Sequence, residues 1–304
     1  MSLRPVKQVI DAKPTMEGAG VKLHRAFGFG QTSEFDPFLL FDDFRNENPE
    51  DFLRGFPWHP HRGIETITYV LAGTVEHGDS LGNRGSLGAG DVQWMTAGSG
   101  IMHQEMPQGD QKGRMHGFQL WANLPSSLKM TRPRYQDIKA GDIPEIVDDD
   151  GTVVRVVVGN FWGKTGPVEG VAADPNYIDV WVPPGKKKTL PVETTRHAFA
   201  YVFEGSGTFR DASHPFGVLT EKSDAAGNEV LVRETVGNRS MVLFDSGDEV
   251  TVQAGDEGIR FLLVSGKPLK EPVAWYGPIV MNTQAELQQA VRELRDGSFI
   301  KETA

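Results

Sequence analysis

Two pairs of potential metal ligands stand out in the first half of the chain. His59 and His61 flank a single proline, and His103 and Glu105 flank a single glutamine. Residues two apart in an extended segment point to the same face, so each pair can direct both side chains at one point. On neighbouring strands, the two pairs would surround one ion with three imidazoles and one carboxylate. Such donors suit Fe, Mn, Co, Ni, Cu or Zn and are poor for Ca or Mg, and four ligands of an octahedral metal leave two positions open.

The other histidines offer fewer indications of a role. A pair of histidines two apart is common by chance and more often structural, so the second pair, forty residues on, carries much of the argument. His116 is a candidate outer partner, because ligating imidazoles usually need one. His77, His197 and His214 are also present, without a motif around them.

Large apolar side chains lie near the four candidate ligands in sequence. They are Phe56, Trp58, Trp94, Met95 and Met106. A place in the core is the ordinary fate of such residues, but they could also line a cavity for a flat aromatic substrate. The two methionines would make such a cavity adaptable.

The elements that would carry these residues are mostly short strands. Segments rich in β-branched and aromatic residues, separated by turn signals about every ten residues, predict a β-sandwich or barrel. The clearest are residues 64–71, 92–95, 118–122 and 153–158.

One long helix is predicted near the end of the chain, as a terminal brace. Thr283 and Glu286 form a capping-box pattern, and Gly297 is a suitable stop. The apolar positions between them fall on one face: Leu287, Ala290, Val291 and Leu294.

A weak internal repeat indicates two copies of one barrel. Residues 69–73 (YVLAG) resemble 201–205 (YVFEG), and Gly90-Asp91 resembles Gly247-Asp248. The loop within the second copy, about 209–239, is longer, polar and rich in glycine.

The repeat also serves as an internal control on the candidate metal site. This alignment places Pro191 and Glu193 opposite the first ligand pair, and Arg260 and Leu262 opposite the second. The second copy therefore lacks the ligand set, which favours a single metal in the first.

The two domains are expected to meet within 132–151. This stretch contains prolines and the acidic run 148–150, which we expect to be a solvated turn rather than an ion site. The expected domains are an N-terminal barrel with the metal site, 1–135, and a C-terminal barrel without ligands, 136–304, which includes the helix.

Composition excludes several classes of function. The chain of 304 residues has 31 Lys and Arg against 41 Asp and Glu, a net charge of −10. An acidic chain is a poor binder of nucleic acid or anionic membranes. With 0 cysteines, disulfides, thiolate nucleophiles and Cys-ligated metals are excluded. The start of the chain lacks a secretory signal pattern and no stretch is long and apolar enough to span a bilayer, so we expect a cytoplasmic protein, or a nuclear one in a eukaryote.

Five segments closely resemble the pirin family of bicupins. They are 36–44 (DPFLLFDDF), 56–69 (FPWHPHRGIETITY), 90–107 (GDVQWMTAGSGIMHQEMP), 120–125 (LWANLP) and 277–283 (GPIVMNT). Thr96 and Gly55 depart from the general cupin pattern, and pirins share both departures. The resemblance implies an all-β chain of two tandem cupin barrels, jelly-roll-like, with a short C-terminal helix.

The resemblance also implies a cofactor and two kinds of function. It places one mononuclear non-haem iron, Fe(2+), on His59, His61, His103 and Glu105; the donor set leaves Ni, Mn, Co, Cu and Zn open. Some pirin-like proteins open flavonols such as quercetin with O2 and release CO. Others regulate a protein partner, such as a nuclear transcription cofactor. We therefore expect a quercetin 2,3-dioxygenase, in which Glu105 also acts as the catalytic base.

Two alternatives remain open. An iron-dependent redox sensor would bind a protein partner, a transcription cofactor or a metabolic enzyme, through a surface that could include Arg62 or the lysine run 186–188. The substrate could also be an aromatic molecule unrelated to flavonols. The ligand set is the same in all three cases.

Overall fold

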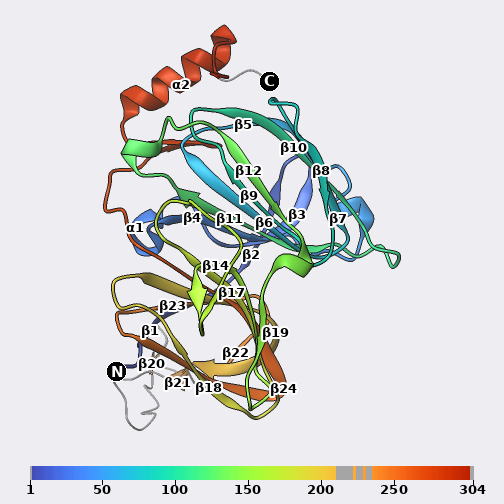
Figure 1. The fold of residues 1–304 in the computed structure, drawn as a ribbon, viewed down its shortest axis with the longest axis vertical. Helices are drawn as coiled ribbons and strands as arrows, with labels where there is room; N and C mark the ends of the chain where they lie inside the picture. Colours follow the sequence, from blue (N-terminus) through green and yellow to red (C-terminus); the bar gives the residue numbers. More distant parts are fainter. Residues whose placement is uncertain (1, 210–221, 224–228, 231–234, 302–304) are drawn as a thin grey trace. The chain divides into compact units, whose positions relative to one another are not determined.

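Short runs of β-branched and aromatic residues form most of the structure. The computed structural model describes residues 2–209, 222–223, 229–230 and 235–301 (Figure 1). Residues 64–71 lie in β6 (Ile64–Ala72), because their side chains fit a pleated surface, and Gly73 follows in a left-handed conformation. The other three expected strands are β9 (Val92–Thr96), β11 (His116–Asn123) and β14 (Val153–Val158). The all-β prediction is confirmed.

The chain divides into two compact units, and both are discontinuous in sequence. The first unit contains Ala12–Pro144, Val157–Pro175 and Gly266–Ala304. The second unit contains Met1–Asp11, Glu145–Val156 and Asn176–Ser265. This division differs from the two consecutive ranges expected from the sequence, since each terminus of the chain joins the unit built mainly from the other half.

Two sheets form the framework of the first unit. One has the strand order β12 (Arg134–Ile138), β9, β6, β11, β4 (Phe38–Asp43), β3 (Val21–Phe27) and β2 (Lys13–Glu17). The other has the order β5 (Phe56–His61), β10 (Ile101–Gln108), β7 (Thr74–Asp79) and β8 (Arg84–Leu87). Buried apolar residues from both sheets fill the space between them, including Val70, Val75 and Leu87 in one cluster.

The second unit is built on one nine-stranded sheet. Its order is β1 (Val6–Asp11), β23 (Ser240–Phe244), β19 (His197–Phe209), β24 (Glu249–Gly266), β17 (Asn176–Val182), β14 and β13 (Glu145–Val147), with β18 (Lys187–Pro191) on β24 and β22 (Val236–Gly237) on β19. His214 and most of the loop expected over 209–239 lie outside the described residues.

The remaining elements are short, apart from one helix. Three hairpins pair β15 (Asn160–Phe161) with β16 (Lys164–Thr165), β20 (Lys222–Ser223) with β21 (Glu229–Val230), and β25 (Ala274–Tyr276) with β26 (Ile279–Met281). The helical segments are α1 (Thr32–Phe35), α2 (Gln284–Asp296) and the 3-10 turns η1 (Pro49–Asp51), η2 (Ser126–Leu128) and η3 (Ala140–Asp142).

The predicted terminal helix is α2, and it closes the first unit. Thr283 caps it through a complete capping box with Glu286, and Gly297 ends it in a left-handed conformation. Leu287 and Ala290 are buried against the β25–β26 hairpin, whose Val280 lies in a core cluster of the first barrel. The helix therefore braces the barrel that lies far from it in the sequence.

Strand pairing corrects one part of the repeat alignment. Tyr69 in β6 pairs with β9 and Tyr201 in β19 pairs with β23, so β23 takes the place of β9. Gly247-Asp248 instead precedes β24, one strand further along. The sequence alignment was therefore one strand out of step in its second part, and Arg260 and Leu262 are not the counterparts of the second ligand pair.

The corrected pairing gives the ligand strands new counterparts in the second unit. The first part of β24 pairs with β18, as β10 pairs with β5 in the first unit. At that point Thr189 and Thr251 lie opposite each other, with their hydroxyl oxygens 2.9 Å apart. Neither strand carries a histidine, so the three imidazoles have no counterparts on these two strands.

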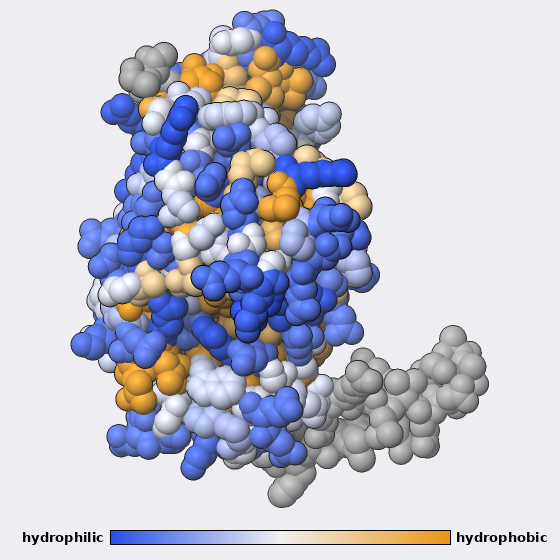
Figure 2. Space-filling model, turned by 90° about the vertical axis from the view of Figure 1, so that its right-hand side faces the viewer, coloured by the Kyte–Doolittle hydropathy of each residue, from blue (hydrophilic) through white to orange (hydrophobic). Residues whose placement is uncertain are grey.

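The surface is mostly polar, as the charge of the chain predicts. On the face shown in Figure 2, hydrophilic residues dominate and apolar residues gather only in small groups. Within the described part of the chain, no helix combines the length and the apolarity that crossing a bilayer requires.

Candidate metal site

Strands β5 and β10 bring the two ligand pairs together. They are antiparallel neighbours, and the register places His59 opposite His103. β5 lies at the edge of its sheet, where its prolines, Pro57 and Pro60, cost few ladder hydrogen bonds. The alternation of an extended strand then turns His61 to the same side as His59.

The three imidazoles form one cluster. Candidate ligand nitrogens of His59, His61 and His103 all lie within 4.8 Å of one another. Their ring centroids are 4.3 to 4.9 Å apart. Among the residues that the structure describes, these three histidines are the group of clustered His, Cys, Asp or Glu side chains that could hold a metal ion.

Backbone carbonyls set the tautomers of two of these rings. His59 Nδ1 lies 2.8 Å from the carbonyl oxygen of Pro57, and His61 Nδ1 lies 3.2 Å from that of Pro278. A carbonyl can only accept, so each Nδ1 carries a proton and donates it. In its neutral form, each ring then presents the lone pair of Nε2, which is the form that binds a metal.

The contact between these two lone pairs fits a bound cation. The Nε2 atoms of His59 and His61 are 3.1 Å apart, a distance at which two lone pairs repel each other. Two nitrogens at right angles, each about 2.1 Å from an ion, are separated by about 3 Å. The pair thus has the spacing of adjacent ligands on one ion.

Burial keeps the imidazoles of His61 and His103 neutral. Burial lowers the pKa of His61 well below its ordinary value, and neighbouring His59 lowers that pKa further. Burial lowers the pKa of His103 in the same way, with added effects from the other histidines. Both ring nitrogens of His103 are buried without a hydrogen-bond partner, and such orphaned groups call for a ligand. The three side chains therefore fit a transition-metal ion.

Glu105 lies beside this cluster rather than within it. Its carboxylate oxygen Oε1 accepts a hydrogen bond from Thr68 Oγ1 at 2.9 Å, and Thr68 Oγ1 lies at the same distance from Gln119 Oε1. A break in the β5–β10 register falls between His103 and Glu105. Burial raises the pKa of Glu105, while His59 and Thr68 act in the opposite direction.

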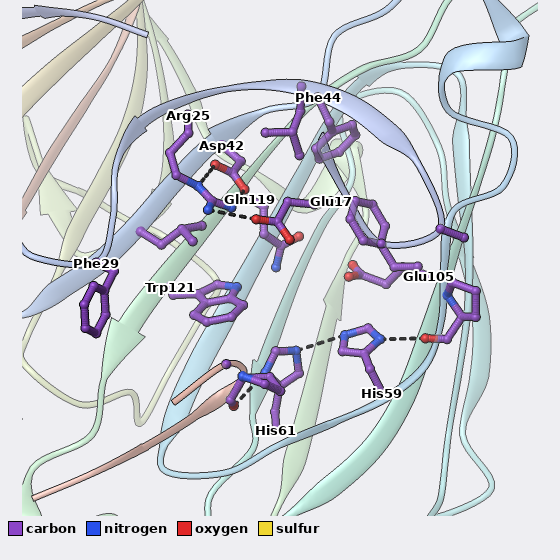
Figure 3. Close-up of a pocket in the computed structure, with 18 of the residues that line it drawn as sticks. Glu17, Arg25, Phe29, Asp42, Phe44, His59, His61, Glu105, Gln119 and Trp121 are labelled. Atoms are coloured by element: carbon purple, nitrogen blue, oxygen red, sulfur yellow. Dashed lines mark hydrogen bonds and ion pairs between the residues drawn. The ribbon is translucent and has the colours of Figure 1, made fainter. Parts of the chain in front are cut away.

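A cavity of about 650 Å³ opens in front of His59 and His61 (Figure 3). Its lining includes His59, His61, Glu105 and several aromatic side chains. Trp121 packs edge-on against His61, with ring centroids 5.0 Å apart. The volume lies within the range of about 300–1,000 Å³ that small-molecule sites occupy.

The predicted pocket residues separate into two groups. Phe56 and Trp58 line the cavity, and Trp58 is half exposed. Trp94 and Met95 are fully buried in the core, and Met106 lies against Gly55 instead. Phe56 and Trp58 lie on β5, at the edge of its sheet, whereas Trp94 and Met95 lie on β9, which has a neighbouring strand on each side.

His116 and Arg62 have other surroundings than expected. The His116 ring packs edge-on against Phe118, 5.2 Å between centroids, while backbone carbonyls serve as outer partners of the imidazoles. Arg62 is 2% exposed and donates to the carbonyl oxygens of Ser99 and Phe299. It is therefore no part of an exposed surface for a protein partner.

The charged runs of the second unit meet each other. Lys188 forms ion pairs with Asp148 and Asp150. One lysine of the run 186–188 is therefore paired with two carboxylates of the acidic run. The acidic run, which we expected to be a solvated turn, is therefore also an ion-pair partner of Lys188.

Several cavity residues were not singled out from the sequence. They come from strands distant in sequence and from the C-terminal segment: Glu17, Arg25, Phe29, Asp42, Gln119, Trp121, Trp275 and Pro278. A signal existed for Asp42, Trp121 and Pro278, since all three lie in the pirin-like segments. The others carry no local motif.

Comparison with known proteins places the chain in one family. The family model described as Pirin matches residues 20–122, and the Pirin C-terminal cupin domain matches residues 177–300. A "Pirin-like protein" of Caulobacter vibrioides is 42% identical over 98% of this chain and 100% of its own length. A "Putative quercetin 2,3-dioxygenase" of Pseudomonas aeruginosa is 40% identical over 97% of each chain.

A solved structure gives the same result for the fold. The crystal structure of quercetin 2,3-dioxygenase from Acinetobacter baumannii has a TM-score of 0.82 and 31% identity, covering 98% of this chain and 99% of that one. Sequence and fold agree over nearly the whole length. The chain belongs to the pirin family and consists of two cupin domains.

Proposed function

We propose that this protein is a metal-dependent dioxygenase that opens the heterocycle of flavonols such as quercetin with O2 and releases CO. The observation that carries the proposal is a cluster of three imidazoles, two of which line a cavity together with aromatic side chains. The names of two similar proteins, from Pseudomonas and Acinetobacter, support the substrate class.

His59, His61 and His103 would hold the metal, with Glu105, which lines the same cavity, as a further ligand. Fe(II) is our expectation, and the donor set suits several other divalent metals. When bound, such a metal supplies Lewis acidity at the 3-hydroxyl oxygen of the flavonol.

Glu105 would take up the proton of that 3-hydroxyl on its carboxylate. The carboxylate lines the cavity, and its raised pKa makes it a stronger base than an exposed glutamate. The hydrogen bond from Thr68 keeps Oε1 in place and leaves Oε2 for the proton.

Aromatic side chains would hold the flat rings and exclude water. Phe56 and Trp121 line the cavity together with His59 and His61. Because Trp121 packs against His61, a ring stacked on the indole would lie close to the metal.

Turnover by the purified protein tests this proposal. The protein is stripped of metal, reloaded separately with Fe(II), Ni(II), Mn(II), Co(II), Cu(II) or Zn(II), and mixed with quercetin in air. We expect at least one metal to support loss of the flavonol absorption band, O2 uptake and release of CO. No turnover with any metal would overturn the proposal and favour a regulatory role.

Variants show whether this activity belongs to the imidazole cluster. His59→Ala and His103→Ala should lose bound metal and activity together, because each removes one of three clustered ligands. His116→Ala removes an imidazole outside the cluster and should keep the metal. Equal metal content in all three variants would contradict the assigned ligand set.

A further inference from the structure

The cavity carries a second polar feature on the side opposite the imidazoles. Glu17, Arg25 and Asp42 line this same cavity, and the proposed reaction does not use them. We call these three residues the acceptor wall. In Figure 3, Gln119 and Trp121 lie between the acceptor wall and the imidazoles.

The acceptor wall is held by a network of short hydrogen bonds. Arg25 Nε and Nη2 donate to Asp42 Oδ1 and Oδ2, each at 2.8 Å. Arg25 Nη1 lies 2.9 Å from Glu17 Oε1. These contacts engage three of the five N–H groups of the guanidinium, whereas carboxylate oxygens keep further lone pairs. The acceptor wall therefore offers mainly acceptors to a ligand.

The charge of the acceptor wall also favours ligand groups that donate hydrogen bonds. Two carboxylates face one guanidinium, which leaves one net negative charge when both are ionised. Burial raises the pKa of Asp42 to about 6, against the opposing effect of Arg25, so Asp42 is largely ionised at neutral pH. An anionic ligand group would be repelled here, whereas a hydroxyl group could donate to a charged acceptor.

Aromatic residues beside the acceptor wall suit a flat ring. Phe29 and Trp275 meet edge to face, with centroids 5.5 Å apart, and Trp275 lies 6.1 Å from Trp121. All three line the cavity. A ring that leaves the imidazole side of the cavity would thus pass between aromatic surfaces on its way to the acceptors.

We propose that the acceptor wall recognises, by accepting hydrogen bonds, the hydroxyl groups on the substrate ring farthest from the metal site. It makes the protein selective for neutral polyphenols over analogues that carry a carboxylate, or no substituent, on that ring. This inference rests on the proposed function, since it specifies the substrate class of the same cavity.

Equilibrium binding to the Fe(II)-loaded protein, without O2, tests the proposal apart from turnover. The probes are galangin, kaempferol and quercetin, which carry none, one and two hydroxyl groups on the phenyl ring, and a flavonol with a carboxylate at that ring. Quenching of tryptophan fluorescence reports binding, because Trp121 and Trp275 line the cavity. We expect quercetin to bind at least about tenfold tighter than galangin, and the carboxylated flavonol to bind more weakly than galangin.

A pair of variants assigns the selectivity to the acceptor wall. Glu17→Met removes an acceptor and the net charge at a partly exposed position on a strand at the sheet edge, so we expect the variant to fold. It should reduce the quercetin-to-galangin ratio to about threefold or less and tighten binding of the carboxylated flavonol. Asp110→Asn alters an ion pair with Arg114 that lies outside the cavity, and should leave both quantities unchanged.

The outcomes separate this inference from the proposed function. Equal binding of galangin and quercetin by the unmodified protein would overturn the inference, as would an equal loss for every probe in Glu17→Met. Turnover of quercetin without hydroxyl selectivity would leave the proposed function standing alone. Selective binding without turnover under any metal would support the acceptor wall and overturn the dioxygenase.

Discussion

The candidate site depends on a few hydrogen bonds that decide which atom of each side chain faces the cavity. The carbonyl oxygens of Pro57 and Pro278 fix Nδ1 of two imidazoles as donors, which leaves Nε2 for a metal. Thr68 holds one oxygen of Glu105. Backbone carbonyls thus do what side-chain carboxylates do at many metal sites.

Glu105→Gln separates metal binding from proton transfer. The amide keeps the size of the side chain and can still accept from Thr68, but it cannot take up a proton at neutral pH. We expect part of the metal to remain, and turnover to fall about 10²- to 10⁴-fold. Metal analysis and O2 uptake measure the two effects.

The control for this variant is Glu76→Gln, on the exposed face of neighbouring β7. It should leave metal content and rate as they are. Unchanged turnover in metal-loaded Glu105→Gln would rule out Glu105 as the base.

At the scale of elements, the segment after β5 is tied to α2. Arg62 follows the second histidine of β5, and its Nη1 lies 2.7 Å from Glu293 Oε2 on α2. Its guanidinium lies 4.2 Å from the centroid of the Phe299 ring. Val280 N donates to Arg62 O at 3.0 Å, so helix, hairpin and ligand strand form one connected structure.

Arg62→Met should destabilise the protein strongly. The change leaves two buried backbone carbonyls without their partner and removes one of the three groups that bond Glu293. Unsatisfied buried acceptors of this kind cost about 2–5 kcal/mol of unfolding free energy in total. Chemical denaturation measures this loss. Arg295→Met, at an exposed position of the same helix, is the control, and a loss for Arg62→Met no larger than the control's would refute the assigned role.

The ion pair on α2 also predicts a pH dependence. Burial acts to raise the pKa of Glu293, but hydrogen bonds from Gln289, Lys301 and Arg62 outweigh it and lower the pKa to about 2. A carboxyl with a lowered pKa stabilises the folded state above its unfolded pKa of about 4.5. This contribution, at most about 3 kcal/mol, is lost as the pH falls from about 5 towards 2.

The difference in unfolding free energy between the unmodified protein and Glu293→Gln isolates this effect. We expect the difference to be constant above about pH 5 and to shrink below it, whereas the exposed Asp296→Asn should show no such trend of comparable size. A difference that grows on acidification would have the wrong sign.

At the scale of the whole molecule, the two units exchange their terminal segments. The segment Gly266–Ala304 belongs to the first unit and Met1–Asp11 to the second. β1 pairs with β23, and Val280 packs with Ile64 and Met95. Neither barrel is completed by its own half of the sequence.

Removal of the C-terminal segment should therefore affect the first barrel, although the cut lies in the other half of the chain. A chain that ends at Ser265 exposes the core where Val280 packs and loses the carbonyl partner of His61. We expect a lower Tm and less bound metal. Co-expression of residues 266–304 should restore both, and an unchanged Tm in the shortened chain would show that the segment is dispensable.

The sequence alone determined the local features of this protein. The two-residue period of a strand puts His59 and His61 of β5 on the same face. The capping box and Gly297 mark the two ends of α2. Each depends on interactions within a few residues, which a single sequence records. The motif around the ligands was also long enough to identify the family.

Only the tertiary structure decided which of these features meet. The opposition of His59 and His103 depends on the register of two strands forty residues apart, and the acceptor wall joins β2, β3 and β4. Long-range strand pairing also corrected the alignment of the repeat by one strand. Packing between distant segments placed α2 on the first barrel. Hydrogen-bond register and burial are set by residues distant in sequence, so spacing along the chain could not reveal them.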